Sequence, residues 1–177
     1  LYEVAAFLQK EQVPIAYGGL IFTQLPELIE FIPGHYLGNS LTGAVQAIEQ
    51  LVLNPPEIKP ETRVAPEYEQ AAEHFKEMQP AITAELWSQF QRNGMQVQYL
   101  EAANHFLGQD IQAALILGDV NLLKHEIDWL TGLLGSHDIS TEYLPKYLSL
   151  YKQAVDKNLD ERGQPVKDWL DLVVNNS

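Results

Sequence analysis

Residues 54–66 read Asn-Pro-Pro-Glu-Ile-Lys-Pro-Glu-Thr-Arg-Val-Ala-Pro, with four prolines in thirteen residues. Proline lacks a backbone N–H donor and has a fixed φ angle, so this composition favours an extended connection over a helix or a strand. We therefore predict a linker over residues 55–66. It divides the 177-residue chain into residues 1–54 and residues 67–177, which have different hydrophobic patterns.

Before the linker, helix and strand patterns alternate over short distances. We expect helices over Leu1–Gln12, Leu25–Phe31 (capped by Thr23) and Leu41–Leu53 (capped by Asn39 or Ser40), and strands over Val13–Tyr17 and His35–Leu37. This order predicts a parallel sheet. Because a parallel sheet is normally covered on both faces and has more than two strands, further strands would have to precede Leu1 or come from another chain. We interpret residues 1–54 as the C-terminal part of an α/β, flavodoxin-like domain.

After the linker, every periodic segment has helical spacing. The predicted helices are Glu67–Met78, a second opened by Pro80 and ending before Asn93, Met95–Leu117 ended by Gly118, Val120–Leu134, one from Ser140 to about Leu159, and a last one opened by Pro165. Short loops between them favour an antiparallel helical bundle. The predicted fold class is mainly α, with a partial α/β segment at the N-terminal side.

The chain is acidic, with 24 Asp and Glu against 11 Lys and Arg and a formal net charge of -13. Such a surface repels phosphate, so direct binding of nucleic acid or an anionic membrane is disfavoured. Cysteine is absent, which excludes disulfides, thiolate metal sites and thiol nucleophiles and fits a cytoplasmic location. No apolar run approaches the ~20 residues that span a bilayer.

Motifs for catalysis are also missing. The sequence has no phosphate-binding P-loop, no Gly-x-Gly-x-x-Gly and no Ser-His-Asp arrangement, so we expect no enzyme. Gly18 and Gly19 follow a predicted strand. This pair is either part of a phosphate or nucleotide site or simply a place where backbones approach closely.

Three histidines on the predicted helices are candidate ligands: His74, His105 and His125. His105 lies in the middle of the longest one and is the best candidate to ligate or hydrogen-bond a planar cofactor; alternatively, it only donates to a neighbouring carbonyl. Glu101 and His105 are four residues apart, whereas carboxylate-bridged metal bundles use Glu-x-x-His. We therefore expect no metal site.

Aromatic residues form a further pattern. Tyr143, Tyr147 and Tyr151 recur every four residues, and three other predicted helices each carry one tryptophan: Trp87, Trp129 and Trp169. Aromatic stripes of this kind either pack in the core or line a ligand pocket. The sequence leaves both interpretations open.

One stretch resembles a known family. It comprises Phe-Leu-Gln-Lys-Glu-Gln-Val-Pro-Ile-Ala-Tyr-Gly-Gly-Leu-Ile-Phe from Phe7, Ile-Pro-Gly-His-Tyr-Leu-Gly from Ile32 and Ala-Ile-Glu-Gln-Leu from Ala47. It resembles the C-terminal end of cobalamin-binding domains in MerR-type bacterial transcriptional regulators. In that family a double glycine, matched here by Gly18 and Gly19, lies near the nucleotide tail of the cofactor.

The resemblance implies a sensory or regulatory module that binds cobalamin, forms homo-oligomers and contacts DNA only through a region outside this chain. The family's Asp-x-His-x-x-Gly motif is absent from these residues, and His35 lies in the wrong place to replace it. The helical part also follows the α/β part here, whereas it precedes it in better-known members.

Two alternatives rest on the helical part alone. The first is a binding protein for haem, a non-covalent bilin or another apolar small molecule, with His105 and the aromatic stripe in its pocket. The second is a metal-dependent enzyme that uses His74, His105 or His125 with nearby glutamates.

Overall fold

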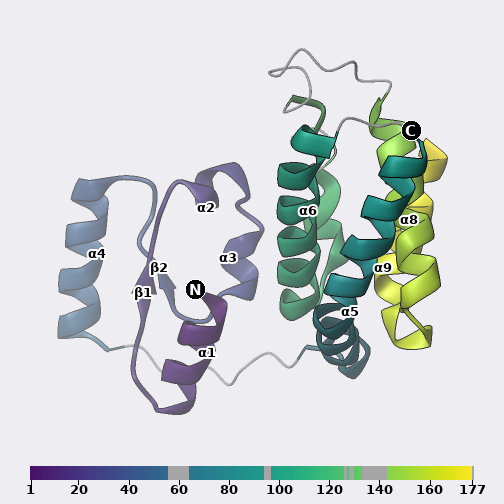
Figure 1. The fold of residues 1–177 in the computed structure, drawn as a ribbon. Coiled ribbons are helices and arrows are strands. Elements are labelled where there is room, and N and C mark those ends of the chain that lie inside the picture. Colours follow the sequence, from purple (N-terminus) through teal and green to yellow (C-terminus); the bar gives the residue numbers. More distant parts are fainter. Residues whose placement is uncertain (56–63, 94–96, 126, 128–129, 133–142, 177) are drawn as a thin grey trace. The chain divides into compact units, whose positions relative to one another are not determined.

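The computed structural model describes residues 1–55, 64–93, 97–125, 127, 130–132 and 143–176 (Figure 1). The chain divides into two compact units, Leu1–Arg63 and Val64–Ser177, which we describe separately. The boundary between them falls inside the proline-rich stretch, of which residues 56–63 lie outside the described part.

The first unit is an α/β unit with a small parallel sheet. Its elements are α1 (Tyr2–Lys10), β1 (Ala16–Tyr17), α2 (Ile21–Gln24), α3 (Leu28–Phe31), β2 (His35–Tyr36) and α4 (Leu41–Leu53). Ala16 pairs with His35 and Tyr17 with Tyr36. The His35 N–H donates to the Ile15 carbonyl at 2.8 Å, and the Leu37 N–H donates to the Tyr17 carbonyl at 2.8 Å. The predicted parallel pairing is confirmed.

The helix predicted over Leu25–Phe31 is confirmed only in its second half, because α3 begins at Leu28. A separate one-turn helix, α2, ends at Gln24, just before the predicted range. Thr23 lies inside α2, where its hydroxyl donates to Asn39 Oδ1 at 3.3 Å instead of capping a helix. Pro26 explains the break, because it cannot donate an N–H and disfavours helical geometry at Leu25, whose ψ is 73°.

Helix α4 begins as predicted, with the Ser40 hydroxyl accepting from the Gly43 N–H at 3.0 Å. Its apolar side chains do not form part of the core: no residue of α4 is buried, and Leu41, Val45 and Val52 are all exposed. The small core of the unit is a cluster of rings, in which Tyr17 lies 4.9 Å from Phe22 and 6.0 Å from Tyr36 between ring centroids.

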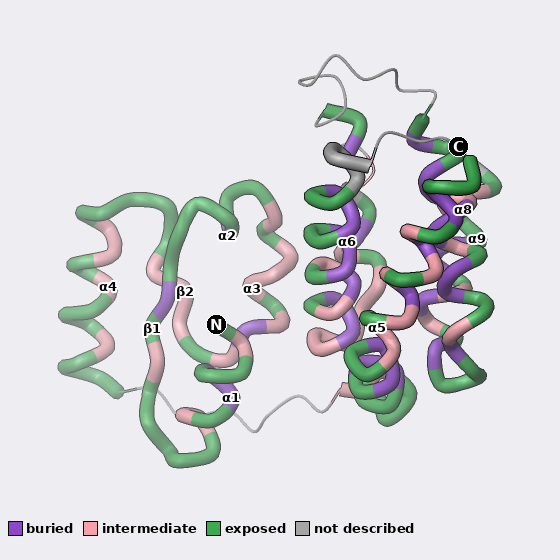
Figure 2. Tube along the Cα trace, in the orientation of Figure 1, coloured by how far each residue is buried: buried purple, intermediate pink, exposed green. Residues whose placement is uncertain are grey.

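The second unit is a helical bundle, as predicted. Its elements are α5 (Pro66–Arg92), α6 (Val97–Leu117), the 3-10 helix η1 (Val120–His125), α8 (Tyr143–Asn158), the 3-10 helix η2 (Glu161–Gly163) and α9 (Gln164–Asn176). Helix α5 packs against α6, α8 and α9, and α8 also packs against α9. Buried residues follow the inner faces of these helices (Figure 2).

Helix α5 corrects a second prediction. Pro80 does not open a new helix but lies inside one helix of 27 residues. Its ring nitrogen leaves the Lys76 carbonyl without the usual N–H donor. Buried residues on both sides of Pro80, including Phe75 and Ile82, belong to the same core, so tertiary packing outweighs the local preference for a break.

The helix predicted over Val120–Leu134 begins instead as the tighter helix η1. The Asp119 carboxylate accepts from the Asn121 N–H at 2.8 Å, and the Leu122 N–H donates to the Asp119 carbonyl at 3.3 Å, which favours three-residue turns. Farther along, the structure describes only residues 127 and 130–132 of that prediction. The predicted helix start at Ser140 lies outside the described residues.

The predicted end of α6 at Gly118 is confirmed. Gly118 has a φ of +81°, its N–H donates to the Leu115 carbonyl at 3.1 Å, and the Asp119 N–H donates to the Ala114 carbonyl at 3.0 Å. These two bonds form a Schellman motif, which satisfies carbonyls that a helix end otherwise leaves without donors.

Candidate functional site

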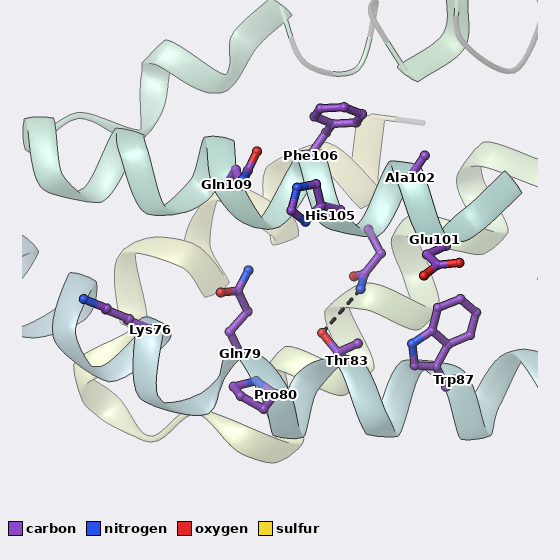
Figure 3. Close-up of a pocket in the computed structure, with 11 residues that line it drawn as sticks. Lys76, Gln79, Pro80, Thr83, Trp87, Glu101, Ala102, His105, Phe106 and Gln109 are labelled. Carbon is purple, nitrogen blue, oxygen red and sulfur yellow. Dashed lines mark hydrogen bonds between the residues drawn. The ribbon is translucent and has the colours of Figure 1, made fainter. Parts of the chain in front are cut away.

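A groove of about 910 Å³ runs between α5 and α6 (Figure 3). Helix α5 contributes positions 76, 79, 80, 83 and 87, a spacing that places them on one helical face. Helix α6 contributes the opposite wall. The lining residues are Lys76, Gln79, Pro80, Thr83, Trp87, Glu101, Ala102, Asn104, His105, Phe106 and Gln109.

His105, the histidine favoured by the sequence, lies in this groove. Its side chain is exposed, and its ring centroid lies 5.5 Å from that of Phe106 in an edge-to-face arrangement. Figure 3 shows the imidazole between the two helices. The position suits a hydrogen-bonding contact to a bound molecule at the surface more than axial ligation inside an apolar pocket.

The base of the groove is formed by a contact between the two helices. Asn104 is 8% exposed, and its side-chain amide donates to the Thr83 hydroxyl at 3.3 Å. Gly108 is buried on α6, and an added Cβ there would collide with the Gln79 amide. The absence of a side chain at Gly108 therefore lets Gln79 fit between the helices.

Two opposite charges occupy the two ends of the groove. Figure 3 shows the Lys76 ammonium at one end and the Glu101 carboxylate beside the Trp87 indole at the other. In the described part of the chain neither Lys76 nor Glu101 forms an ion pair. Within the described part of the chain, both charges are therefore left to interact with a ligand.

His74 lies elsewhere in the bundle and has a structural environment. It is 5% exposed, and its Nε2 accepts from the Asp160 N–H at 3.2 Å and lies 3.2 Å from Asp160 Oδ1. The Arg162 guanidinium and backbone N–H hold the pKa of Asp160 well below its usual range. His74 thus joins α5 to η2.

The described residues do not support the proposed cluster of histidines and glutamates. The side chain of His125 lies outside the described part of the chain. Among the side chains that the structure does describe, no three His, Asp or Glu come together in a way that could hold a metal ion.

The aromatic residues singled out in the sequence differ in their burial. Tyr147 and Tyr151 are buried in the core, and burial raises the pKa of Tyr151, whereas Tyr143 is exposed. Trp87 lines the groove, Trp169 is buried in α9, and Trp129 lies outside the described residues. The core interpretation therefore holds for two of the tyrosines and for Trp169, and Trp87 is the tryptophan that lines the described groove.

Gly18 and Gly19 lie in the other unit, directly after β1. Gly19 has a φ of +142°, and an added Cβ would meet no atom within 4 Å. Gly38, which follows β2, has a φ of +81°, and its carbonyl oxygen lies 3.9 Å from where a Cβ of Gly18 would be. The three glycines thus share the carboxyl edge of the two strands, where α/β sheets usually bind ligands.

No protein-family model and no curated protein matches this chain. The resemblance to cobalamin-binding domains is therefore carried by the sequence alone. Among the described helices, none combines the length and the apolar character needed to cross a membrane.

Sequence reasoning named His105, Glu101 and Trp87 but did not join them into one site. Lys76, Gln79 and Thr83 carry no motif, and they join the other three as a set only when α5 and α6 pack side by side. The one available signal was the helical spacing of the polar positions on α5.

Proposed function

We propose that this chain is a non-catalytic ligand-sensing module whose helical unit binds a small molecule in the groove between α5 and α6. The observation that carries the proposal is the groove itself, because its volume of about 910 Å³ matches that of small-molecule sites. Its walls combine an indole, an imidazole, several amides and two charges that form no ion pair with a described residue. Such a mixture fixes the orientation of a polar ligand.

The position of α5 supports a sensing role. The helix lines the groove with one face and packs against α8 and α9 with others. Phe90 lies one turn after Trp87, and its ring centroid is 6.1 Å from that of Tyr147 on α8. A ligand that binds one arrangement of α5 and α6 more tightly than another would therefore change the packing against α8.

Saturation-transfer NMR with the full chain against a set of small polar and aromatic compounds tests this proposal. Ala102 and Ala113 are both exposed on α6, but only Ala102 lines the groove. Ala102→Trp should fill the groove and abolish binding, whereas Ala113→Trp should leave binding intact. Compounds that bind both variants equally would place the site elsewhere and contradict the proposal.

A second proposal concerns the α/β unit, which we place in a cobalamin-type sensory domain of a transcriptional regulator. The shared edge of Gly18, Gly19 and Gly38 supports it, because open backbone at this edge can approach a phosphate or nucleotide group. The residues that would ligate cobalt are not in the sequence, so only a contact to the nucleotide tail is assigned here. DNA would be contacted by a region outside this chain.

Gel filtration of the full chain with adenosylcobalamin in the dark, followed at visible wavelengths, tests the second proposal. Corrinoid absorbance should elute with the protein and should be lost in Gly18→Phe but not in Gly132→Phe, a change at an exposed glycine of the other unit. A wild-type chain that elutes without corrinoid would contradict cofactor binding by these residues.

A further inference from the structure

The groove between α5 and α6 has an electrostatic polarity that restricts its ligand. At the end where Glu101 lies, the Trp87 indole stands beside the carboxylate (Figure 3). An indole face and a carboxylate both attract a positively charged nitrogen, the indole through its π electrons and the carboxylate through its charge. Neither the face of the indole nor the carboxylate attracts an anion.

The other end of the groove has the opposite character. Lys76, eleven residues before Trp87 on α5, is displaced from it by about 16 Å along the helix. Its ammonium group repels a second positive charge at that end. Between the two ends lie neutral hydrogen-bonding groups, the amides of Gln79 and Gln109 and the Thr83 hydroxyl, which suit an uncharged polar body.

The net charge of the whole chain also favours a cation over an anion. Its formal net charge of -13 creates a field that raises the local concentration of cations and lowers that of anions. A purely anionic ligand would need to overcome that field with Lys76 as the one positive charge that lines the described groove. A cation gains from both the field and Glu101.

We propose that the groove takes a small organic cation, with a flat, positively charged nitrogen ring on Trp87 and beside Glu101 and an uncharged polar remainder directed toward Lys76. This inference rests on the proposed small-molecule function of the same groove and names the chemical class of the ligand.

Proflavine, a flat fluorescent cation, and anilinonaphthalene sulfonate, an aromatic anion, serve as probes in titrations of the full chain by fluorescence anisotropy at low salt. Proflavine should bind saturably, and Glu101→Gln should weaken its binding about three- to tenfold, the size expected for one partly exposed carboxylate beside an indole. Trp87→Leu should weaken it similarly. Lys76→Met should leave it unchanged or tighter.

Glu73→Gln is the matched control, because Glu73 is exposed on the same helix, lies outside the groove and loses the same charge. It should change proflavine affinity by less than about twofold, the part due to the general field. Circular dichroism of each variant checks that the fold is retained. Equal weakening by Glu73→Gln and Glu101→Gln would overturn the inference, since the cation would then respond to net charge alone.

Two further outcomes separate the proposal of an organic cation from the proposal that the groove is a small-molecule site. If the sulfonate binds in a way that Ala102→Trp abolishes while proflavine does not bind, the cation assignment is overturned and the groove stands as a ligand site. If proflavine binds and Ala102→Trp does not reduce its affinity, both the assignment and the groove as the site are overturned.

Discussion

At the residue scale, the histidines show how one residue type has different roles in one bundle. His74 and His105 both lie on long helices, and the sequence gives both as candidate ligands. The structure buries His74 against Asp160 and leaves His105 exposed in the groove. Periodicity assigns a residue to a helix face but does not say which neighbouring helix or turn covers that face, so this difference was not predictable.

Replacing each histidine by alanine should separate the two roles. His74→Ala removes a buried ring and the acceptor of the Asp160 N–H, and should lower the free energy of unfolding by about 2–3 kcal/mol. His105→Ala, at an exposed position, should change it by less than about 0.5 kcal/mol. Urea unfolding followed by circular dichroism measures both, and equal losses would show that His105 also contributes to folding.

Asp160 gives the protein a defined response to acid. Its carboxylate accepts from the Arg162 backbone N–H at 2.9 Å and from the guanidinium at 2.8 Å, which lowers its pKa in the folded state from the usual 3.8. A depressed folded pKa contributes stability above the unfolded pKa, and that contribution is lost as the pH falls through the folded value.

Asp160→Asn should therefore lower the urea midpoint at pH 7, and its difference from wild type should shrink between about pH 4 and pH 2. Glu161→Gln, a charge loss in the same turn, serves as the control and should have a smaller effect at pH 7. A difference between Asp160→Asn and wild type that stays constant from pH 7 to pH 2 would refute the role of the Asp160 charge.

At the scale of elements, two prolines show that local sequence alone does not determine whether a proline ends a helix. Pro26 lies between the one-turn helices α2 and α3 and delays the start of a predicted helix to Leu28, whereas Pro80 lies inside α5 without ending it. Local chemistry is the same in both cases. The difference is that α5 has buried residues on both sides of its proline, while α3 has none, so only α5 gains enough packing to continue.

Where a helix begins or ends for a local reason, the sequence was sufficient to predict that boundary. Ser40 begins α4 through its own hydroxyl, and Gly118 ends α6 through a positive φ. Both effects depend on a few neighbouring residues. The groove was not predictable in the same way, because Trp87 and His105 are brought together by the packing of α6 on α5, and their separation of eighteen positions contains no signal for that packing.

Pro80→Ala should stabilise the protein. The alanine N–H restores a donor to the Lys76 carbonyl, and a steric conflict in the helix is removed. Proline also restricts the unfolded chain, and this stabilising effect is lost, so the net increase in the free energy of unfolding should be about 1–2 kcal/mol. Pro66→Ala, at the first position of the same helix, should give no gain, because no intrahelical donor is missing there. Thermal unfolding measures both variants, and a loss of stability in Pro80→Ala would show that the proline is needed by the packing.

At the scale of the whole molecule, buried apolar residues are divided unequally between the two units. The large core cluster is drawn entirely from the helical unit, between Ala71 and Leu170. In the α/β unit the buried apolar residues are Ala5, Ala6, Tyr17, Phe22 and Ile32, while many large apolar side chains, such as Phe7 and Leu41, are exposed. Because burial of apolar surface drives folding, we expect the helical unit to contribute most of the protein's stability.

A fragment of residues 64–177 should therefore fold alone, with a cooperative thermal transition and the near-ultraviolet circular dichroism of a packed core. A fragment of residues 1–63 should lack such a transition. Calorimetry of the two fragments and of the full chain tests this prediction. A fragment 64–177 that melts without cooperativity would mean that the helical core depends on the α/β unit.

The aromatic rings of the helical unit form a continuous series from the groove into the core. Centroid distances are 5.7 Å from Trp87 to Phe90, 6.1 Å from Phe90 to Tyr147 and 6.0 Å from Tyr147 to Tyr151. Light absorbed by the two buried tyrosines can pass by resonance transfer to the nearby indole, which faces the groove. Emission from Trp87 is thus an intrinsic signal of core packing at one end of the series, and at the other end it would report a ligand bound in the groove.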